Sequence, residues 1–148
     1  MATRGLELEF VNFGNSLLHM LGAMPTVLVV DDEFGIVDVL ETILTDEGYR
    51  VLTACNGRQG LGRLSEEKLD VILLDFMMPI LGGAEMLRVM ALDPACQSIP
   101  VIMISSLRED VIAEKCKGYA AFLHKPFRAA AVLSIVARVL GRGTNDAG

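Results

Sequence analysis

The chain has 148 residues, a formal net charge of −6 and 52% hydrophobic residues. This length suffices for one domain with a proper core, and it leaves too few residues for a second domain of ordinary size. The acidic balance and the lack of clustered Lys and Arg argue against a nucleic-acid surface, so proteins and cations are the expected partners.

Apolar runs are frequent, but none reaches the roughly 18 residues that a membrane-spanning helix requires, and a soluble protein without a membrane partner is expected. Three cysteines, Cys55, Cys96 and Cys116, are widely spaced and match no metal-binding pattern. Their odd number and spacing favour free thiols in a reducing compartment, which predicts a cytoplasmic location.

The two ends of the chain differ from the part between them. Residues 1–24 lack a basic start followed by a small-residue cleavage site, so a signal peptide is not expected. They are compatible with a short amphipathic helix that docks elsewhere, with a frayed end, or with an extension from expression or from an upstream start. Residues 142–148 are small and polar and are expected to be disordered, which leaves 25–141 as the domain.

Between these ends, apolar strand-like runs alternate with segments whose apolar residues recur at helical spacing. In chain order, the predicted elements are a strand at 26–30, a helix at 34–47, a strand at 50–54, a helix at 58–66, a strand at 70–75, a helix at 83–92, a strand at 99–105, a helix at 107–117, a strand at 120–123 and a helix at 127–140. Gly48 supplies the stop of the first helix, whereas glycines weaken the prediction of the second.

Strands that alternate with helices at such short spacings imply a parallel sheet, because right-handed crossovers place helices over both of its faces. The predicted fold class is therefore α/β, a doubly wound five-stranded parallel sheet. In such sheets the functional crevice lies beyond the carboxyl ends of the strands. The polar residues expected at those ends are Asp31, Asp32, Asp75, Ser105 and Lys125.

These side chains form a set that suits phosphoryl transfer. Three carboxylates in one crevice repel one another unless a cation lies between them, and Mg²⁺ prefers such oxygen ligands. Lys125 and Ser105 supply a positive charge and a hydroxyl for oxygens that carry charge during the transfer. A carboxylate can itself be the nucleophile and form an aspartyl phosphate.

Several short motifs at these strand ends resemble the receiver domain of bacterial response regulators, whose simplest members are single-domain chemotaxis-type regulators. The motifs are Val29-Val30-Asp31-Asp32-Glu33, Leu74-Asp75-Phe76-Met77-Met78-Pro79, Gly83, Ser105-Ser106 and Lys125-Pro126-Phe127. Each is weak alone, but their common order on predicted strand ends is specific. The resemblance covers residues 25–140 and implies a flavodoxin-like (βα)5 fold.

By this resemblance, Asp75 is the phosphoacceptor and Lys125 contacts the phosphoryl group. The resemblance further implies that Asp32, Asp75 and the backbone carbonyl of Met77 hold Mg²⁺, and that Asp31 acts on the ion through water.

The resemblance also implies a switch. Ser105 stands where the family has a hydroxyl that moves to the new phosphoryl oxygen and draws its loop inward. Phe122 takes the position of the aromatic side chain that rotates inward when the hydroxyl leaves its place. Phosphorylation would then change the face formed by the predicted elements 107–117, 120–123 and 127–140.

Two departures from the family pattern lead to predictions for this chain. Met77 and Leu107 are apolar at positions that influence how readily water attacks the phosphoryl group. Because neither can orient a water molecule, the phosphorylated state is expected to persist longer than in fast chemotaxis-type regulators. The segment from Ser105 to Lys125 is slightly short for the family, which predicts an unusual or poorly ordered helix at 107–117.

Each assignment has a plainer alternative. Asp31 and Asp32 would also suit the cap of the following helix, the Ser105 hydroxyl would suit a local backbone group, and Phe122 would suit the core. His124 lies next to the site lysine in a strand, where neighbours face opposite ways, so a structural or surface histidine is expected.

The resemblance implies a chain that receives its phosphoryl group from a sensor histidine kinase or a histidine phosphotransfer protein and controls an unknown downstream protein. A monomer or weak homodimer is expected, without enzymatic activity beyond Mg²⁺-dependent self-phosphorylation and slow autodephosphorylation. Two other functions stay open. A haloacid-type phosphatase is disfavoured by Met77, where that class carries a second Asp. A phosphorylation-independent, receiver-like interaction module is the main alternative.

Overall fold

The computed structural model describes residues 24–145, so residues 1–23 of the predicted N-terminal extension and the last three residues of the predicted tail lie outside it. The described elements are β1 (Thr26–Val30), α3 (Phe34–Asp46), β2 (Arg50–Ala54), α4 (Gly57–Glu66), β3 (Val71–Asp75), α5 (Gly83–Ala91), β4 (Val101–Ser105), α6 (Glu109–Lys115), β5 (Ala121–His124) and α7 (Ala129–Asn145). Among them, no helix is long and apolar enough to cross a membrane.

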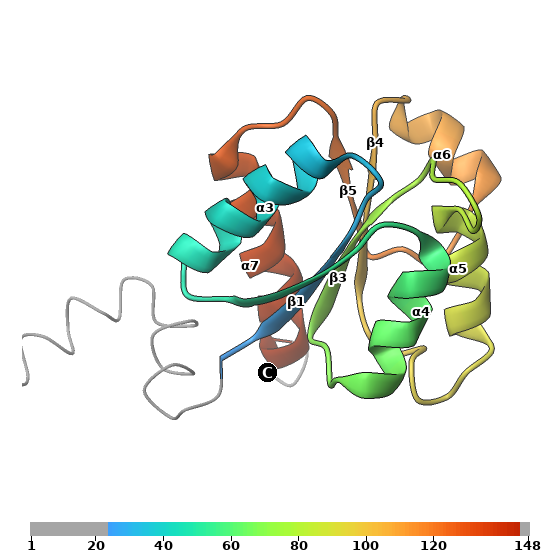
Figure 1. The fold of residues 1–148 in the computed structure, drawn as a ribbon, viewed down its shortest axis with the longest axis horizontal. Helices are drawn as coiled ribbons and strands as arrows, with labels where there is room; N and C mark the ends of the chain where they lie inside the picture. The colour runs from blue at the N-terminus through green and yellow to red at the C-terminus, as the bar shows by residue number, and fades with distance from the viewer. Residues whose placement is uncertain (1–23, 146–148) are drawn as a thin grey trace, which may run out of the picture.

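The five strands form one parallel sheet with the order β2-β1-β3-β4-β5. Helices α3 and α7 cover one face of the sheet, and α4, α5 and α6 cover the other (Figure 1). This arrangement confirms the predicted doubly wound α/β fold. Since β1 and β3 lie in the middle of the sheet, their carboxyl ends are adjacent and central.

The strands β1, β3 and β4 are buried along their whole length. Their side chains alternate between the two core layers: Val27 and Val29 pack beneath α3 and α7, whereas Leu28 and Val30 pack beneath α4 and α5. Burial on both faces explains why these segments are continuous apolar runs rather than alternating ones. The first polar residue that ends or follows each run therefore marks the edge of the core.

Two helices differ from their predicted bounds. Helix α6 has seven residues and is therefore shorter at both ends than the predicted 107–117. Helix α7 continues to Asn145, beyond the predicted end at residue 140, and includes four residues of the tail that was expected to be disordered. A glycine lowers helix stability by only about 1 kcal/mol, so the glycines near this end do not stop a helix already nucleated on the core.

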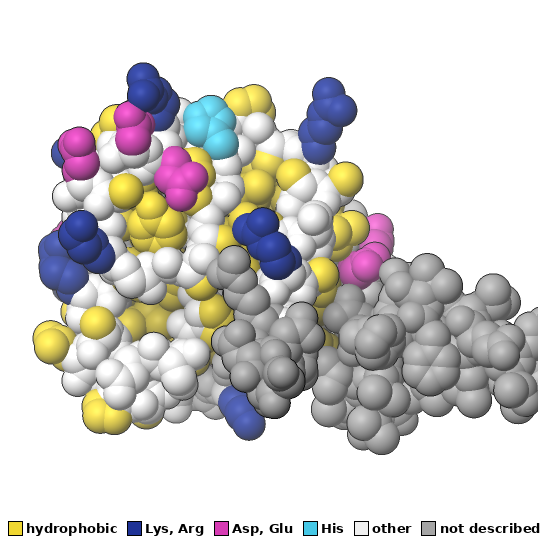
Figure 2. All heavy atoms as spheres, turned by 180° about the vertical axis from the view of Figure 1, so that it is seen from behind, with side chains coloured by type: hydrophobic (Ala, Val, Ile, Leu, Met, Phe, Trp, Pro, Cys, Tyr) yellow, Lys and Arg dark blue, Asp and Glu magenta, His cyan; other side chains and the backbone are white. Residues whose placement is uncertain are grey.

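The surface of the described part is mixed in character. Seen from the side opposite to Figure 1, hydrophobic patches lie among scattered Lys, Arg, Asp and Glu side chains (Figure 2). This face offers no continuous basic surface among the residues described, in keeping with the net charge of −6.

Candidate functional site

Four polar residues meet at the carboxyl edge of the sheet because each directly ends or follows a strand. Asp31 follows β1, Asp75 ends β3, Ser105 ends β4 and Lys125 follows β5. Asp31, Asp75 and Ser105 are only 1%, 5% and 3% exposed, although all three are polar. Burial of this kind requires partners for each group.

The acidic cluster, Asp31, Asp32 and Asp75, has one carboxylate oxygen from each residue within 4.8 Å of the others. Asp31 and Asp75 are buried, and Asp32 is exposed at the mouth. Closely spaced carboxylate oxygens are the donors that hard divalent cations prefer. The residues therefore fit a metal ion such as Mg²⁺.

Lys125 binds this cluster from the side of β5. Its Nζ lies 2.9 Å from Asp31 Oδ2, 3.3 Å from Asp75 Oδ1 and 3.3 Å from Glu33 Oε1. Desolvation acts to lower the pKa of Lys125, but the hydrogen bond to Asp31 and the charges of Asp75 and Asp31 outweigh it and raise that pKa. The ammonium group stays charged and neutralises only part of the acidic cluster.

Burial, followed by the charge of Asp31, raises the pKa of Asp75 from 3.8 to about 7. Lys125 opposes this shift, and Asp32 adds to it. A carboxyl group with such a pKa is partly protonated at neutral pH and is then a poor nucleophile. A bound divalent cation would favour the charged form.

Glu33 belongs to the site, although the sequence analysis assigned it no role. Its backbone N–H donates to Asp31 Oδ1 at 2.9 Å, and its carboxylate contacts Lys125. Asp31 thus has both a local backbone partner and a distant ammonium partner, so helix capping is not its only contact. The sequence does show Glu33 as the third acidic residue in a row after β1. It does not show which of these acids a lysine far along the chain contacts.

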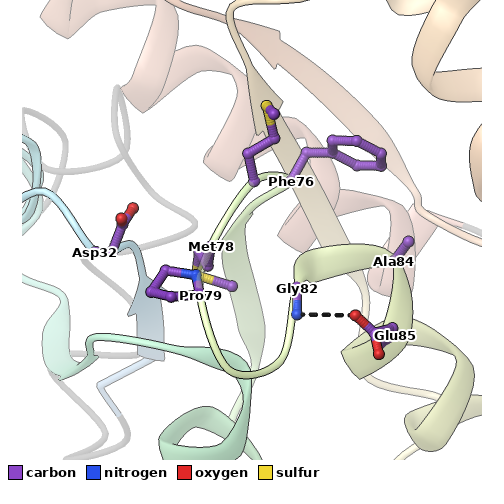
Figure 3. A pocket seen from close by; sticks show the side chains of 8 residues that line it. Asp32, Phe76, Met78, Pro79, Gly82, Ala84 and Glu85 are labelled. Carbon is purple, nitrogen blue, oxygen red and sulfur yellow. Dashed lines mark hydrogen bonds between the residues drawn. The ribbon is translucent and has the colours of Figure 1, made fainter.

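The loop between β3 and α5 borders the acidic cluster. Gly83 starts α5 so close to the backbone carbonyl of Asp75 that a Cβ atom there would clash with it. This close approach explains the glycine at that position. A pocket of about 510 Å³ lies beside the loop, and Asp32, Met77, Met78 and Glu85 are among the residues that line it. Figure 3 shows Asp32 and Glu85 on opposite sides of this pocket.

Met77 lines this pocket and is 67% exposed. Ile80, in the same loop, has a positive φ of 71°. On either side of it, Leu81 N–H donates a hydrogen bond to the Pro79 carbonyl oxygen at 2.7 Å. A β-branched residue is strained in this region, and the sequence offered no sign of it.

The predicted switch residues lie next to the site but do not bind the acidic cluster. The Ser105 hydroxyl oxygen accepts a hydrogen bond from Leu107 N–H at 3.0 Å. Leu107 and Phe122 are half-buried and pack against the core layer beneath α5 and α6. His124 is exposed, as expected, and its Nε2 lies 3.0 Å from the Ser106 carbonyl oxygen.

Residues 27–137 match the family model described as response regulator receiver domain. The transcriptional regulatory protein AfsQ1 of Streptomyces coelicolor is 31% identical over 125 residues, which are 83% of this chain and 54% of that protein. The chain thus spans about half the length of this curated relative.

Two solved structures share the fold. The chemotaxis response regulator CheY4 of Vibrio cholerae has a TM-score of 0.75 and 30% identity, over 78% of this chain and 98% of that one. The receiver domain of the sensor histidine kinase PA1611 from Pseudomonas aeruginosa, solved with a magnesium ion in its active-site cleft, has a TM-score of 0.73 and 29% identity, over 80% and 99%. The chain therefore belongs to the response regulator receiver domains of two-component systems, whose general function is phosphorylation-dependent switching.

Proposed function

We propose that this chain accepts a phosphoryl group on Asp75 from a phosphohistidine of a sensor histidine kinase or a histidine phosphotransfer protein. The observation that carries this proposal is the placement of Asp75, buried at a central strand end between two other carboxylates and 3.3 Å from the ammonium group of Lys125. A carboxylate with these neighbours is positioned for charge stabilisation rather than for a turn or a cap.

In the proposed transfer, an Asp75 carboxylate oxygen forms a bond to phosphorus while the P–N bond of phosphohistidine breaks. The leaving imidazole nitrogen keeps the electron pair of that bond and takes a proton from solvent. Lys125 contacts the phosphoryl oxygens as negative charge passes to the site. Asp32, Asp75 and the Met77 backbone carbonyl would hold Mg²⁺, with Asp31 acting through water, and the bound ion would neutralise charge on the phosphoryl group.

The proposed response begins at Ser105. Its hydroxyl leaves Leu107 N–H and donates to a phosphoryl oxygen on Asp75, which moves the loop after β4 toward the site. Phe122, on the neighbouring strand, then adopts a more buried position. The change reaches the face formed by α6, β5 and α7, where an unknown downstream protein binds.

The phosphorylated state is proposed to be long-lived, because Met77 and Leu107 offer no polar group that orients water. The monomeric or weakly dimeric state and the cytoplasmic location remain part of the proposal, the latter supported by three free thiols. No enzymatic activity is proposed beyond Mg²⁺-dependent self-phosphorylation and slow autodephosphorylation.

Intact-mass measurement after incubation with a small phosphodonor and Mg²⁺ tests this function. We expect one base-labile phosphoryl adduct on the wild-type chain, none on Asp75→Asn, and none without Mg²⁺. Asp46→Asn, an exposed acid at the far end of α3, is the matched control and should be modified like the wild type. An unmodified, folded wild-type chain would instead favour the phosphorylation-independent interaction module.

A further inference from the structure

Three hydrogen bonds hold the start of the loop between β4 and α6. Lys125 N–H donates to the Ser105 carbonyl at 2.8 Å, which continues the pairing of β4 with β5. Leu107 N–H donates to the Ser105 hydroxyl at 3.0 Å. The Ser106 carbonyl oxygen lies 3.0 Å from His124 Nε2, and this third bond alone uses a side chain from another strand.

The direction of the third bond follows from its chemistry. A carbonyl oxygen only accepts, so Nε2 of His124 must carry the hydrogen, which both the charged imidazole and one neutral tautomer provide. The strand register places His124 opposite Ser105, so its side chain stands beside the loop that Ser105 begins. Its ring also lies 6.3 Å from that of Phe122, two residues earlier in β5.

We propose that His124 is a positioning residue that holds the Ser106 carbonyl, and with it the loop, in the unphosphorylated arrangement. This inference rests on the proposed switch role of Ser105. The Ser106 carbonyl and the Leu107 N–H belong to one planar, rigid peptide unit, so the His124 bond and the Ser105 hydroxyl bond hold the two ends of the same unit. When the Ser105 hydroxyl turns toward a phosphoryl group on Asp75, this unit loses the bond at its N–H end and moves with the loop. The Ser106 carbonyl then moves away from His124 Nε2, and the bond breaks.

A bond made in only one of two states shifts the equilibrium toward that state. The His124 bond therefore lowers the population of the arrangement that binds the phosphoryl group, and it weakens the apparent affinity for a phosphoryl mimic by the same factor. Both partners are exposed, so water can replace the bond, and the expected factor is about two- to tenfold.

Two substitutions separate the hydrogen bond from the ring contact. His124→Phe keeps a ring beside Phe122 and removes the donor, whereas His124→Gln keeps an N–H donor at a similar distance from the backbone and removes the ring. Each variant is saturated with Mg²⁺ and titrated with beryllium fluoride, a mimic of the phosphoryl group on a carboxylate, while backbone amide NMR signals report the bound fraction. We expect His124→Phe to bind the mimic about two- to tenfold more tightly than the wild type, and His124→Gln to stay near the wild type.

Two controls exclude a general structural effect. The Mg²⁺ dissociation constant and the melting temperature should be the same in all three proteins, because His124 is exposed and lies outside the acidic cluster. Equal or weaker mimic binding by His124→Phe would overturn the positioning role, and so would tighter binding by both variants. A wild-type chain that binds Mg²⁺ but neither beryllium fluoride nor a phosphoryl group would overturn the proposed function itself, which is a separate outcome.

Discussion

The acidic cluster and the loop between β4 and α6 lie at the same edge of the sheet, but different interactions hold them. Asp31 and Asp75 stand at the ends of two central strands, are almost fully buried, and bind a common lysine through charged contacts. The loop follows a strand nearer the margin and is held by single hydrogen bonds, one of them exposed.

This difference explains how one edge can serve two purposes. Buried charges with fixed partners resist displacement, because each loses several favourable contacts when it moves. Exposed hydrogen bonds are worth little net free energy, because water replaces them. The proposed chemistry therefore occupies the rigid part, whereas the proposed movement occupies the part that costs little to rearrange.

The largest expected effect comes from removing the charge that the acidic cluster shares. Lys125→Gln takes away the cationic partner of Asp75 among the residues described, and we expect phosphorylation by a small donor to slow by about 100-fold. The rate is measured by intact mass at saturating Mg²⁺. Lys117→Gln, an exposed change beyond α6, serves as the control and should leave the rate unaltered. Similar rates for the two variants would show that Lys125 does not contact the transferred group.

The next effect concerns pH. Because the pKa of Asp75 rises from 3.8 to about 7 on folding, only the folded state holds this proton between these two values. The stabilising contribution is complete below pH 3.8 and is lost as the pH rises through about 7. Without divalent cations, the wild type should lose about 4 kcal/mol relative to Asp75→Asn between pH 4 and pH 8, because each pKa unit of the shift corresponds to about 1.4 kcal/mol.

Chemical denaturation of both proteins with a chelator present, at several pH values, measures this difference. Added Mg²⁺ should restore the wild type at pH 8, because it binds the folded state, and should restore Asp75→Asn less. A stability difference that is constant from pH 4 to pH 8 would contradict the raised pKa.

The smallest expected effect is on the rate of dephosphorylation, and it concerns Met77, which lies beside the acidic cluster. Met77→Asn places a polar group at the mouth of the site, where it can orient water, and we expect dephosphorylation to accelerate by about tenfold. Met77 suits this test because its side chain is 67% exposed, whereas Leu107 packs against the core and its replacement would also disturb folding. Phosphate release from the labelled protein is followed over time. Loss of the phosphoryl group from the wild type within seconds would contradict a long-lived phosphorylated state. An unchanged rate of loss in Met77→Asn would show that Met77 does not contribute to that lifetime.

Prediction succeeded where a local pattern reflects burial. The runs that became β1 and β3 are apolar because both faces of these strands are covered, and the carboxylates after them mark the edge of the core. Prediction of the element bounds was weaker where helix and loop conformations are close in free energy, as at the ends of the short helix α6 and at the C-terminal end of α7. The sequence analysis missed the contact of Glu33 with Lys125 and the strained backbone of Ile80. Neither a long-range ion pair nor a backbone angle produces a repeating pattern of residue types in the sequence.

By itself, the sequence determined the alternation of strands and helices, the α/β fold class and the set of polar residues at the strand ends. Hydrophobic periodicity is a local property, so short segments suffice to read it. Only the tertiary structure decided that Lys125 binds Asp31, 94 positions earlier, that Asp75 has a raised pKa, and that His124 reaches the Ser106 carbonyl. These features depend on strand order, on burial and on side-chain direction, which arise only when distant segments pack together.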